Sequence, residues 1–438
     1  MSYDLGKKLI KSKKFTKAII FFQKILNDNP DDLRANFQMG KIFYDLNHLK
    51  KSILFFKKCD SIQPNTPNIL FNLALALQNT GNIKDARNNY LNLISENPKD
   101  VQSYYGLYSL NINNISKEYL TNLKELLTDT KISTYEKSLI NFILSKIERK
   151  NGNINKEIEY LEKSHKQCYN AHLSFNEESN FYYNNIISNY FDKINFVKSF
   201  KSQANFNNLN HIFIIGLPRS GSSLVETIIN HSAKNMISFG EFHGINTSIL
   251  NQISEIIYSK NFNSKEFQIN INQNLFQDNL IERYVSFENK TFIDKSLENF
   301  FNIEIILNFF PNAKFVHTYR NYNDAIIAIY QTMLPELSWS HRIGDIKRYF
   351  NFYKKTINYF KKKYPDKIID VELSKLTESK EIEVKKILNF CEIEINKNFL
   401  DFDKNEKLFN KTNSFLQVRE KIQKYDDKKY QPYYYLLD

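Results

Sequence analysis

Residues 211–230 read His-Ile-Phe-Ile-Ile-Gly-Leu-Pro-Arg-Ser-Gly-Ser-Ser-Leu-Val-Glu-Thr-Ile-Ile-Asn. The first six residues form a short apolar, β-branched run that ends at glycine, which is typical of a buried strand in a parallel sheet. The residues after Gly221 have the periodicity of a helix. The order of strand, glycine-bounded loop and helix predicts an α/β domain with a parallel sheet.

The loop between this strand and helix has the features of an anion site. Gly216 and Gly221 have the five-residue offset of a P-loop, so backbone N–H groups and the helix dipole can hold a multiply charged anion. Ser222 stands where a nucleotide triphosphatase has lysine, and Arg219 supplies the cation instead. The sequence therefore argues against a P-loop nucleotide kinase or hydrolase, which remains one alternative.

The loop from Pro218 to Ser223, Pro-Arg-Ser-Gly-Ser-Ser, resembles the phosphosulfate-binding loop of the sulfotransferase superfamily, whose usual form is Pro-Arg-Ser-Gly-Thr-Thr. The two serines replace threonines and keep the hydroxyl groups. This resemblance implies a P-loop-like α/β sulfotransferase domain.

Three further segments follow in the order of that family. Residues 291–300, Thr-Phe-Ile-Asp-Lys-Ser-Leu-Glu-Asn-Phe, are similar to its Asp-Lys-Met-Pro-x-Asn-Phe segment. Residues 311–330 resemble the segment that binds a 3′-phosphate, with Arg320 and Asp324 in place and Ala328 where the family has serine. Residues 412–419, Thr-Asn-Ser-Phe-Leu-Gln-Val-Arg, are similar to a segment of the tetratricopeptide-linked and tyrosyl-protein sulfotransferase branch. The Tyr-Glu pair that the family often has before Leu376 is absent.

The resemblance implies 3′-phosphoadenosine 5′-phosphosulfate (PAPS) as the donor of the sulfuryl group. Arg219 and Lys295 would be the catalytic cations at the leaving oxygen and the sulfuryl group. No metal ion is expected, because the transferring group bears a single negative charge. The donor-binding residues implied are Pro218, Arg219, Ser220, Gly221, Ser222, Ser223, Arg320, Ser414, Gln417 and Arg419.

Residues 239–243, Phe-Gly-Glu-Phe-His, offer two candidates for the general base. In the tyrosyl-protein-like branch a glutamate after glycine at this position is the base, so the resemblance favours Glu241. His243 is the alternative, because an unperturbed imidazole already titrates near neutral pH.

The first half of the chain repeats with a period of 34 residues. Pro30, Pro64 and Pro98 fall on this period, as do one small-residue column and one aromatic column. The columns are Gly6, Gly40 and Ala74, and Phe22, Phe56 and Tyr90. Over residues 3–100 the chain resembles the tetratricopeptide repeat (TPR) family, and a degenerate unit follows near residues 145–161. We expect roughly four to five helix pairs stacked as an α-solenoid that ends near residue 170. Two roles of the solenoid remain open: a groove that binds a protein or peptide partner, and a scaffold that packs against the C-terminal domain.

These patterns predict three parts: a TPR-like helical repeat domain over 1–170, a helical linker over 171–209, and a sulfotransferase domain over 210–438.

The chain has 438 residues but only 10 glycines and 9 prolines, which favours helix. Its net charge of +12 is interleaved with acids, so no nucleic-acid partner is expected. Three widely spaced cysteines, no leader and no long apolar run predict a cytoplasmic protein without a transmembrane segment.

The expected function is PAPS-dependent transfer of a sulfuryl group to an acceptor hydroxyl, by in-line displacement with a carboxylate general base. A second alternative is a TPR adaptor whose sulfotransferase-like domain is inactive. The acceptor stays open among a peptide, a glycan and a small molecule.

Overall fold

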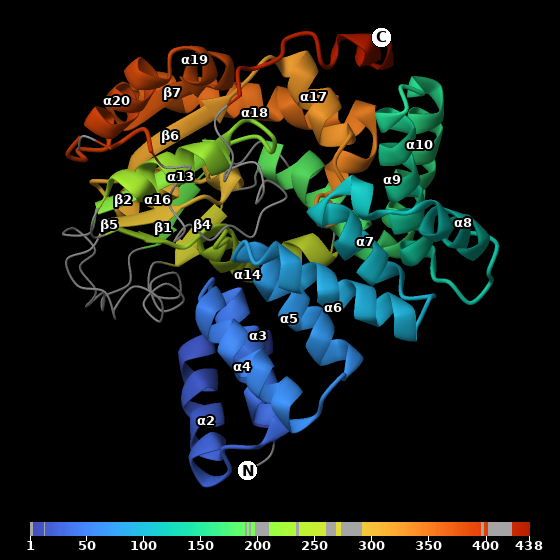
Figure 1. Cartoon of the computed structure of the whole chain (residues 1–438). Helices are drawn as coiled ribbons and strands as arrows, with labels where there is room; N and C mark the ends of the chain where they lie inside the picture. The colour runs from blue at the N-terminus through green and yellow to red at the C-terminus, as the bar shows by residue number, and fades with distance from the viewer. Residues whose placement is uncertain are drawn as a thin grey trace. The chain divides into compact units, whose positions relative to one another are not determined.

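The computed structural model describes residues 3–12, 14–188, 191, 194–197, 210–233, 236–259, 269–272, 291–395, 398–401 and 423–438. The chain forms two compact units (Figure 1). The first ends at Ala171 and the second begins at His172.

The first unit is a series of antiparallel helix pairs joined by short turns. Its helices are α1 (Tyr3–Lys11), α2 (Phe15–Asp28), α3 (Leu33–Asp45), α4 (Leu49–Ile62), α5 (Pro67–Asn79), α6 (Ile83–Glu96), α7 (Val101–Leu110), α8 (Lys117–Leu126), α9 (Thr134–Lys150) and α10 (Ile154–Ala171), with a 3₁₀ turn η1 (Ile112–Asn114). The predicted helical repeat is thus confirmed. Each of the three prolines follows the end of a second helix, as the period predicts.

The small and aromatic columns of the repeat meet in space. A Cβ atom on Gly6 would lie 2.5 Å from Phe22, and one on Gly40 would lie 2.7 Å from Phe56. Both phenylalanines and Ala74 are buried, and the Ser52 hydroxyl donates to the carbonyl of Gly40 at 2.8 Å. The glycines therefore let the two helices of a pair approach until the aromatic ring lies against the backbone.

The second unit is built on a parallel sheet of five strands in the order β3-β5-β2-β6-β7. The strands are β2 (Asn210–Gly216), β3 (Met236–Ser238), β5 (Thr291–Asp294), β6 (Lys314–Tyr319) and β7 (Ile368–Glu372). The predicted strand at 211–216 is the central one. After β2 the chain forms β3 and β5 on one side of β2, and later it forms β6 and β7 on the other side. The direction in which strands are added therefore reverses at the end of β2.

Helices connect and cover these strands. They are α11 (Leu173–Phe181), α13 (Ser222–Ser232), α14 (Gly244–Ser259), α16 (Ile303–Phe309), α17 (Tyr322–Tyr330), α18 (Ile343–Lys363), α19 (Leu373–Glu378) and α20 (Lys380–Phe390). Shorter turns are the π-helical η2 (Tyr182–Ile187) and the 3₁₀ turns η3 (Leu297–Phe301), η4 (Ser338–His341), η5 (Pro365–Lys367) and η8 (Gln431–Leu437).

The two faces of the sheet bury different side chains. On one face Ile212 and Ile214 pack with apolar residues of α13 and α20. On the other face aromatic rings dominate, with Phe213 stacked on Phe315 at 5.5 Å between ring centroids. Burial of β2 on both faces explains its unbroken apolar sequence.

The expected linker, residues 171–209, contains α11 and η2 and also a short strand, β1 (Ile194–Val197). This strand pairs in parallel with β4 (Ile269–Asn272). This two-stranded sheet was not predicted from the sequence, and the three-part division of the chain stays a prediction. Among the described residues, no helix is long and apolar enough to cross a membrane.

Candidate functional site

Four strand ends place the predicted site residues at one edge of the sheet. The loop with Arg219 follows β2, Glu241 lies three residues after β3, Lys295 follows β5 directly, and Arg320 follows β6 directly. These four strands are adjacent and parallel, so their carboxyl ends lie at the same edge. This edge, where the winding reverses, is where open α/β sheets bind their ligands.

The loop after β2 has a backbone that only certain residues allow. Gly216 has φ +141, and a Cβ atom there would lie 2.2 Å from the carbonyl oxygen of Thr318. Gly221 has φ +89, and a Cβ atom there would lie 2.7 Å from Leu373. Arg219 has φ +65 although it is not glycine. Non-glycine residues adopt this region rarely and with strain, and such residues cluster at ligand sites.

The loop leads directly into the N-terminus of α13, for which Gly221 is the N-cap residue. Ser222 and Ser223 are buried in the first turn, and the Ser220 hydroxyl donates to the carbonyl of Leu217. Nη1 of Arg320 donates to the carbonyl of Arg219 at 3.1 Å and so links two loops of the site. The arrangement can hold an anion between a helix N-terminus and two arginines.

Arg320 is buried among residues from the end of the chain. The hydroxyl oxygen of Tyr425 accepts from Nε at 3.2 Å and from Nη2 at 2.8 Å. The guanidinium lies 4.8 Å from the ring centroids of both Tyr425 and Tyr430. Asp324, the predicted companion of Arg320, lies 3.9 Å from Nη2. These contacts fix the direction of the guanidinium.

Asp324 accepts hydrogen bonds from two tyrosines of the same C-terminal segment. One donor is Tyr425, and the other is Tyr434 at 2.6 Å. Burial and the Asp324 carboxylate raise the pKa of Tyr434 to about 12, so this hydroxyl stays protonated and remains a donor. Tyr425 and Tyr434 were not among the predicted site residues, because nothing in their spacing connects them with residues about a hundred positions earlier.

A buried lysine lies between two carboxylates on the other side of the loop. Nζ of Lys295 donates to Oε1 of Glu241 at 2.8 Å and lies 3.7 Å from Oε2 of Glu226. The side chain of Lys295 is 1% exposed and that of Glu241 is 47% exposed. The proposed base thus contacts both the predicted cation and solvent.

Glu226, on α13, was not among the predicted site residues. A single acid inside the apolar helix sequence Leu-Val-Glu-Thr-Ile-Ile was the feature that could have identified it. Burial raises the pKa of Glu226, and Lys295 opposes that rise only in part. For Lys295, burial lowers the pKa, but Glu241 and Glu226 outweigh it, so the net pKa is raised. Lys295 is therefore a permanent cation at neutral pH.

Of the remaining predicted residues, the structure describes His243 and Pro218. The backbone N–H of His243 donates to the Ser296 hydroxyl at 2.8 Å, and its side chain is exposed. Pro218 is half-buried in the loop. Ser414, Gln417 and Arg419 lie outside the described residues.

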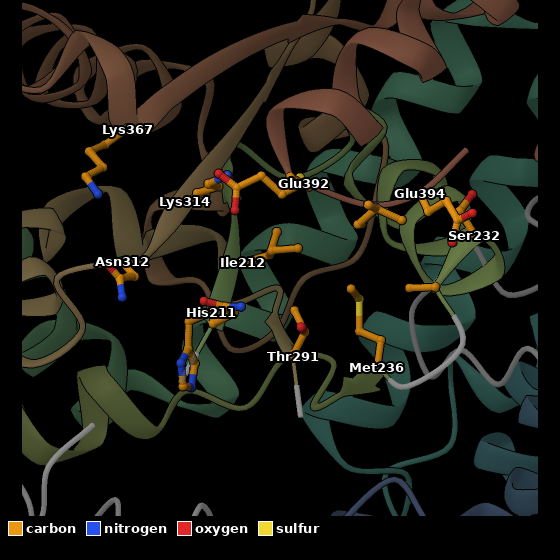
Figure 2. A pocket seen from close by; sticks show the side chains of 14 residues that line it. His211, Ile212, Ser232, Met236, Thr291, Asn312, Lys314, Lys367, Glu392 and Glu394 are labelled. Carbon is orange, nitrogen blue, oxygen red and sulfur yellow. The ribbon is translucent and has the colours of Figure 1, made fainter. Parts of the chain in front are cut away.

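A cavity of about 640 Å³ lies at the opposite, amino edge of the sheet (Figure 2). Asn210, Thr291 and Lys314, the first residues of β2, β5 and β6, line it. Nζ of Lys314 is held by Oε1 of Glu392 at 2.7 Å and by the carbonyl of Phe390 at 2.7 Å. None of the predicted site residues lines this cavity.

Comparison with protein families gives matches in both units. Residues 211–397 match the model of the sulfotransferase family. Residues 33–66 and 67–100 match the model of the tetratricopeptide repeat. A relative from Aquifex aeolicus (strain VF5), described as an uncharacterized protein, is 23% identical over 380 residues. The match covers 83% of this chain and 48% of the relative, so the chain spans about half the length of that relative.

Solved structures with partial similarity come from both classes of protein. The sulfotransferase domain from the curacin biosynthetic pathway is 14% identical, with 51% of this chain and 95% of that chain covered and a TM-score of 0.30. Sulfotransferase STF1 from Mycobacterium tuberculosis H37Rv is 10% identical, with 70% and 98% covered and a TM-score of 0.31. The TPR protein YrrB is 14% identical, with 37% and 83% covered and a TM-score of 0.31.

Proposed function

The chain joins tetratricopeptide repeats to a domain of the sulfotransferase family, and on this premise we propose that it transfers a sulfuryl group from PAPS to an acceptor hydroxyl. The observation that carries the proposal is the convergence of three features at the carboxyl edge of the sheet. These are the glycine-shaped loop at the start of α13, the buried Arg320, and the contact between Lys295 and Glu241.

The donor-binding assignment follows from charge and backbone shape. The loop from Pro218 to Ser223 would hold the 5′-phosphosulfate, because its backbone and hydroxyls lie at a helix N-terminus. Arg320 would hold the 3′-phosphate. A guanidinium has five N–H groups, so Arg320 can keep its contacts with Arg219 and Tyr425 and also donate to a phosphate oxygen. Ala328, which replaces the serine of the family, leaves more of that contact to Arg320. Ser414, Gln417 and Arg419 remain donor-binding proposals from the sequence.

The reaction that we propose is an in-line displacement at sulfur. A bond forms between the acceptor oxygen and sulfur while the bond between sulfur and the bridging oxygen of the nucleotide breaks. The electron pair of the broken bond stays on that bridging oxygen, and the acceptor proton goes to the base. Arg219 and Lys295 would neutralise the charge that develops on the leaving oxygen and on the sulfuryl group.

We assign the base to Glu241. Its carboxylate is nearly half exposed, which lets an acceptor approach, and it touches the cation that would face the sulfuryl group. Oε1 of Glu241 accepts a hydrogen bond from Lys295. A donor oxygen that replaced Glu241 as the partner of the lysine would release this carboxylate toward the acceptor. His243, two residues further along the same turn, remains the rival base.

We assign the repeat unit to recognition of a protein or peptide partner, since stacked helix pairs form surfaces of this use. If the chain is instead an adaptor with an inactive sulfotransferase-like domain, the wild type should transfer no sulfate in the assay below.

Transfer of labelled sulfate from PAPS to peptide, glycan and lipid extracts tests the function. We expect label on one of these classes with the wild type, and none with E241Q, which should still bind nucleotide. Turnover retained by E241Q would move the role of base to His243. If the wild type labels nothing but hydrolyses adenosine triphosphate with magnesium, the proposed function is wrong.

A further inference from the structure

Glu226 is buried where a carboxylate is costly. It lies in the second turn of α13, between apolar residues, and is 7% exposed. Burying an ionised carboxylate costs several kcal/mol unless charge and hydrogen bonds offset it. Replacing such a group by an apolar residue is often neutral or stabilising in proteins, so stability alone does not account for it.

The carboxylate of Glu226 is fixed on both of its oxygens. Oε1 accepts from the Ser238 hydroxyl at 2.5 Å, and Oε2 lies 3.7 Å from Nζ of Lys295. The Ser238 oxygen in turn accepts from the backbone N–H of Gly240 at 3.1 Å. The backbone N–H of Lys295 donates to the carbonyl of Gly240 at 2.9 Å. Glu226 therefore anchors the turn that presents Glu241, and it does so next to the lysine that Glu241 contacts.

We propose that Glu226 is a positioning residue that holds the turn of Glu241 and, through its negative charge beside Lys295, makes Glu241 a stronger base. This inference rests on the proposed function, because it concerns the proton that Glu241 would take from the acceptor.

The sign of the effect follows from the charges of the three groups. With both carboxylates ionised and Lys295 protonated, the group has a net charge of −1, and it becomes neutral when Glu241 takes a proton. Without the charge of Glu226 the same step would go from neutral to +1 around a lysine that is 1% exposed. A buried uncompensated cation is unfavourable, so loss of Glu226 opposes proton uptake by Glu241 and lowers its pKa.

The other charged groups around the turn come from each neighbouring element. His243 lies on the turn itself, Asp294 ends β5 and accepts from the N–H of Ser296, and Arg219 lies in the loop before α13. Glu298 of η3 accepts hydrogen bonds from Tyr183 at 2.7 Å and Tyr349 at 2.9 Å. None of these groups changes when Glu226 is replaced, so the comparison of variants isolates Glu226.

The test is a titration of the Glu241 side-chain carboxyl by ¹³C NMR in the wild type and in E226Q, with the signal assigned by its loss in E241Q. Glutamine keeps the size and the hydrogen bond of Glu226 with Ser238 but removes the charge. We expect the pKa of Glu241 to be lower in E226Q by about one unit, and kcat at pH 7 to fall by up to about tenfold. E226D, which keeps the charge, should restore the pKa of Glu241 at least in part. An unchanged pKa in E226Q would overturn the proposal.

The matched control is E383Q. Glu383 is 9% exposed on α20 and pairs with Lys386 at 3.6 Å. E383Q therefore removes a buried carboxylate elsewhere in the same unit, and it should leave the pKa of Glu241 unchanged. An equal shift in E383Q would also overturn the proposal, because the effect would then not be local.

Failure of this inference and failure of the proposed function have different results. If the wild type does not bind 3′,5′-adenosine bisphosphate, the proposed function fails. If it binds the bisphosphate and E226Q leaves the pKa of Glu241 unchanged, only the role of Glu226 fails.

Discussion

The two edges of the five-stranded sheet place their charges differently. At the carboxyl edge, Lys295 and Arg320 are 1% and 8% exposed, and the connecting loops contain residues in the left-handed region. At the amino edge, Lys314 pairs with Glu392, whose side chain is 77% exposed, beside the cavity of about 640 Å³. The described cavity thus lies at the amino edge, and the buried cations lie at the carboxyl edge. Left-handed non-glycine residues occur at both edges, Arg219 at the carboxyl edge and Glu392 at the amino edge.

Buried and exposed charges act differently on a bound ligand. Fixed charges in a region of low dielectric act strongly on a bound anion, whereas exposed ion pairs are screened by water and salt. Buried cations and a close-approach glycine are therefore better indicators of the site than cavity volume. Substitutions at the two edges test this contrast.

The glycine at the end of β2 should be the least replaceable residue at the carboxyl edge. In G216A the new Cβ atom would lie 2.2 Å from the backbone oxygen of Thr318. The residue also has a φ of +141, so a steric clash and backbone strain both destabilise the variant. We expect a loss of about 3–5 kcal/mol in the free energy of unfolding, measured by denaturant titration. G344A is the control, because a Cβ atom on Gly344 would meet nothing within 4 Å. Equal effects of the two substitutions would refute the close approach.

Removing a lysine should matter more at the carboxyl edge than at the amino edge. K295M leaves Glu226 buried without its counter-ion, and breaking such a pair costs about 3 kcal/mol in the free energy of unfolding. K314M removes an ion pair whose partner is exposed, and should cost less than about 1 kcal/mol. Denaturant titration of both variants checks the difference. If K314M is the more destabilised variant, the contrast between the edges is wrong.

The same contrast applies to ligand binding. R320A removes the guanidinium that we assign to the 3′-phosphate, and hydrogen bonds to a charged group contribute about 1.5–3 kcal/mol. We therefore expect affinity for 3′,5′-adenosine bisphosphate to fall about 10- to 100-fold in calorimetric titration. K367A, at the amino-edge cavity, should leave the affinity unchanged. A comparable loss in K367A would place the nucleotide at the amino edge.

The smallest expected effect concerns acid stability between β6 and β7. Burial alone would raise the pKa of Asp370, but its hydrogen bonds with His317 and Lys361 lower it to about 2. The unfolded carboxyl titrates near its ordinary value of about 3.9, so these interactions stabilise the fold above that pH and are lost as pH falls toward 2. Since the side chain of Asp370 is 43% exposed, the effect should stay below about 1 kcal/mol. D370N should lose this pH dependence in acid unfolding, and an identical profile would contradict the assignment.

The sequence predicts those parts of the molecule in which neighbouring residues determine the structure. The repeat is local, so the spacing of Pro30, Pro64 and Pro98 was enough to place helix ends. In a parallel sheet each strand brings the residue after it to one edge, so Lys295 and Arg320 could be placed with the loop of β2 once their strands were recognised.

The contacts that the sequence did not predict join distant segments. Tyr425 reaches Arg320 across 105 positions, and no period or motif marks that pairing. Glu226 was visible as an acid in an apolar helix, but its relation to Ser238 and Lys295 depends on how β3 and β5 pack beside α13. Such tertiary contacts require the structure.

Calorimetric titration of the full chain with 3′,5′-adenosine bisphosphate and, separately, with adenosine triphosphate and magnesium tests which class of nucleotide the loop after β2 binds. We expect saturable binding of the bisphosphate that is abolished or sharply weakened in R219A, together with much weaker binding of the triphosphate. Tight binding of the triphosphate with magnesium, or bisphosphate binding that R219A leaves intact, would contradict this expectation.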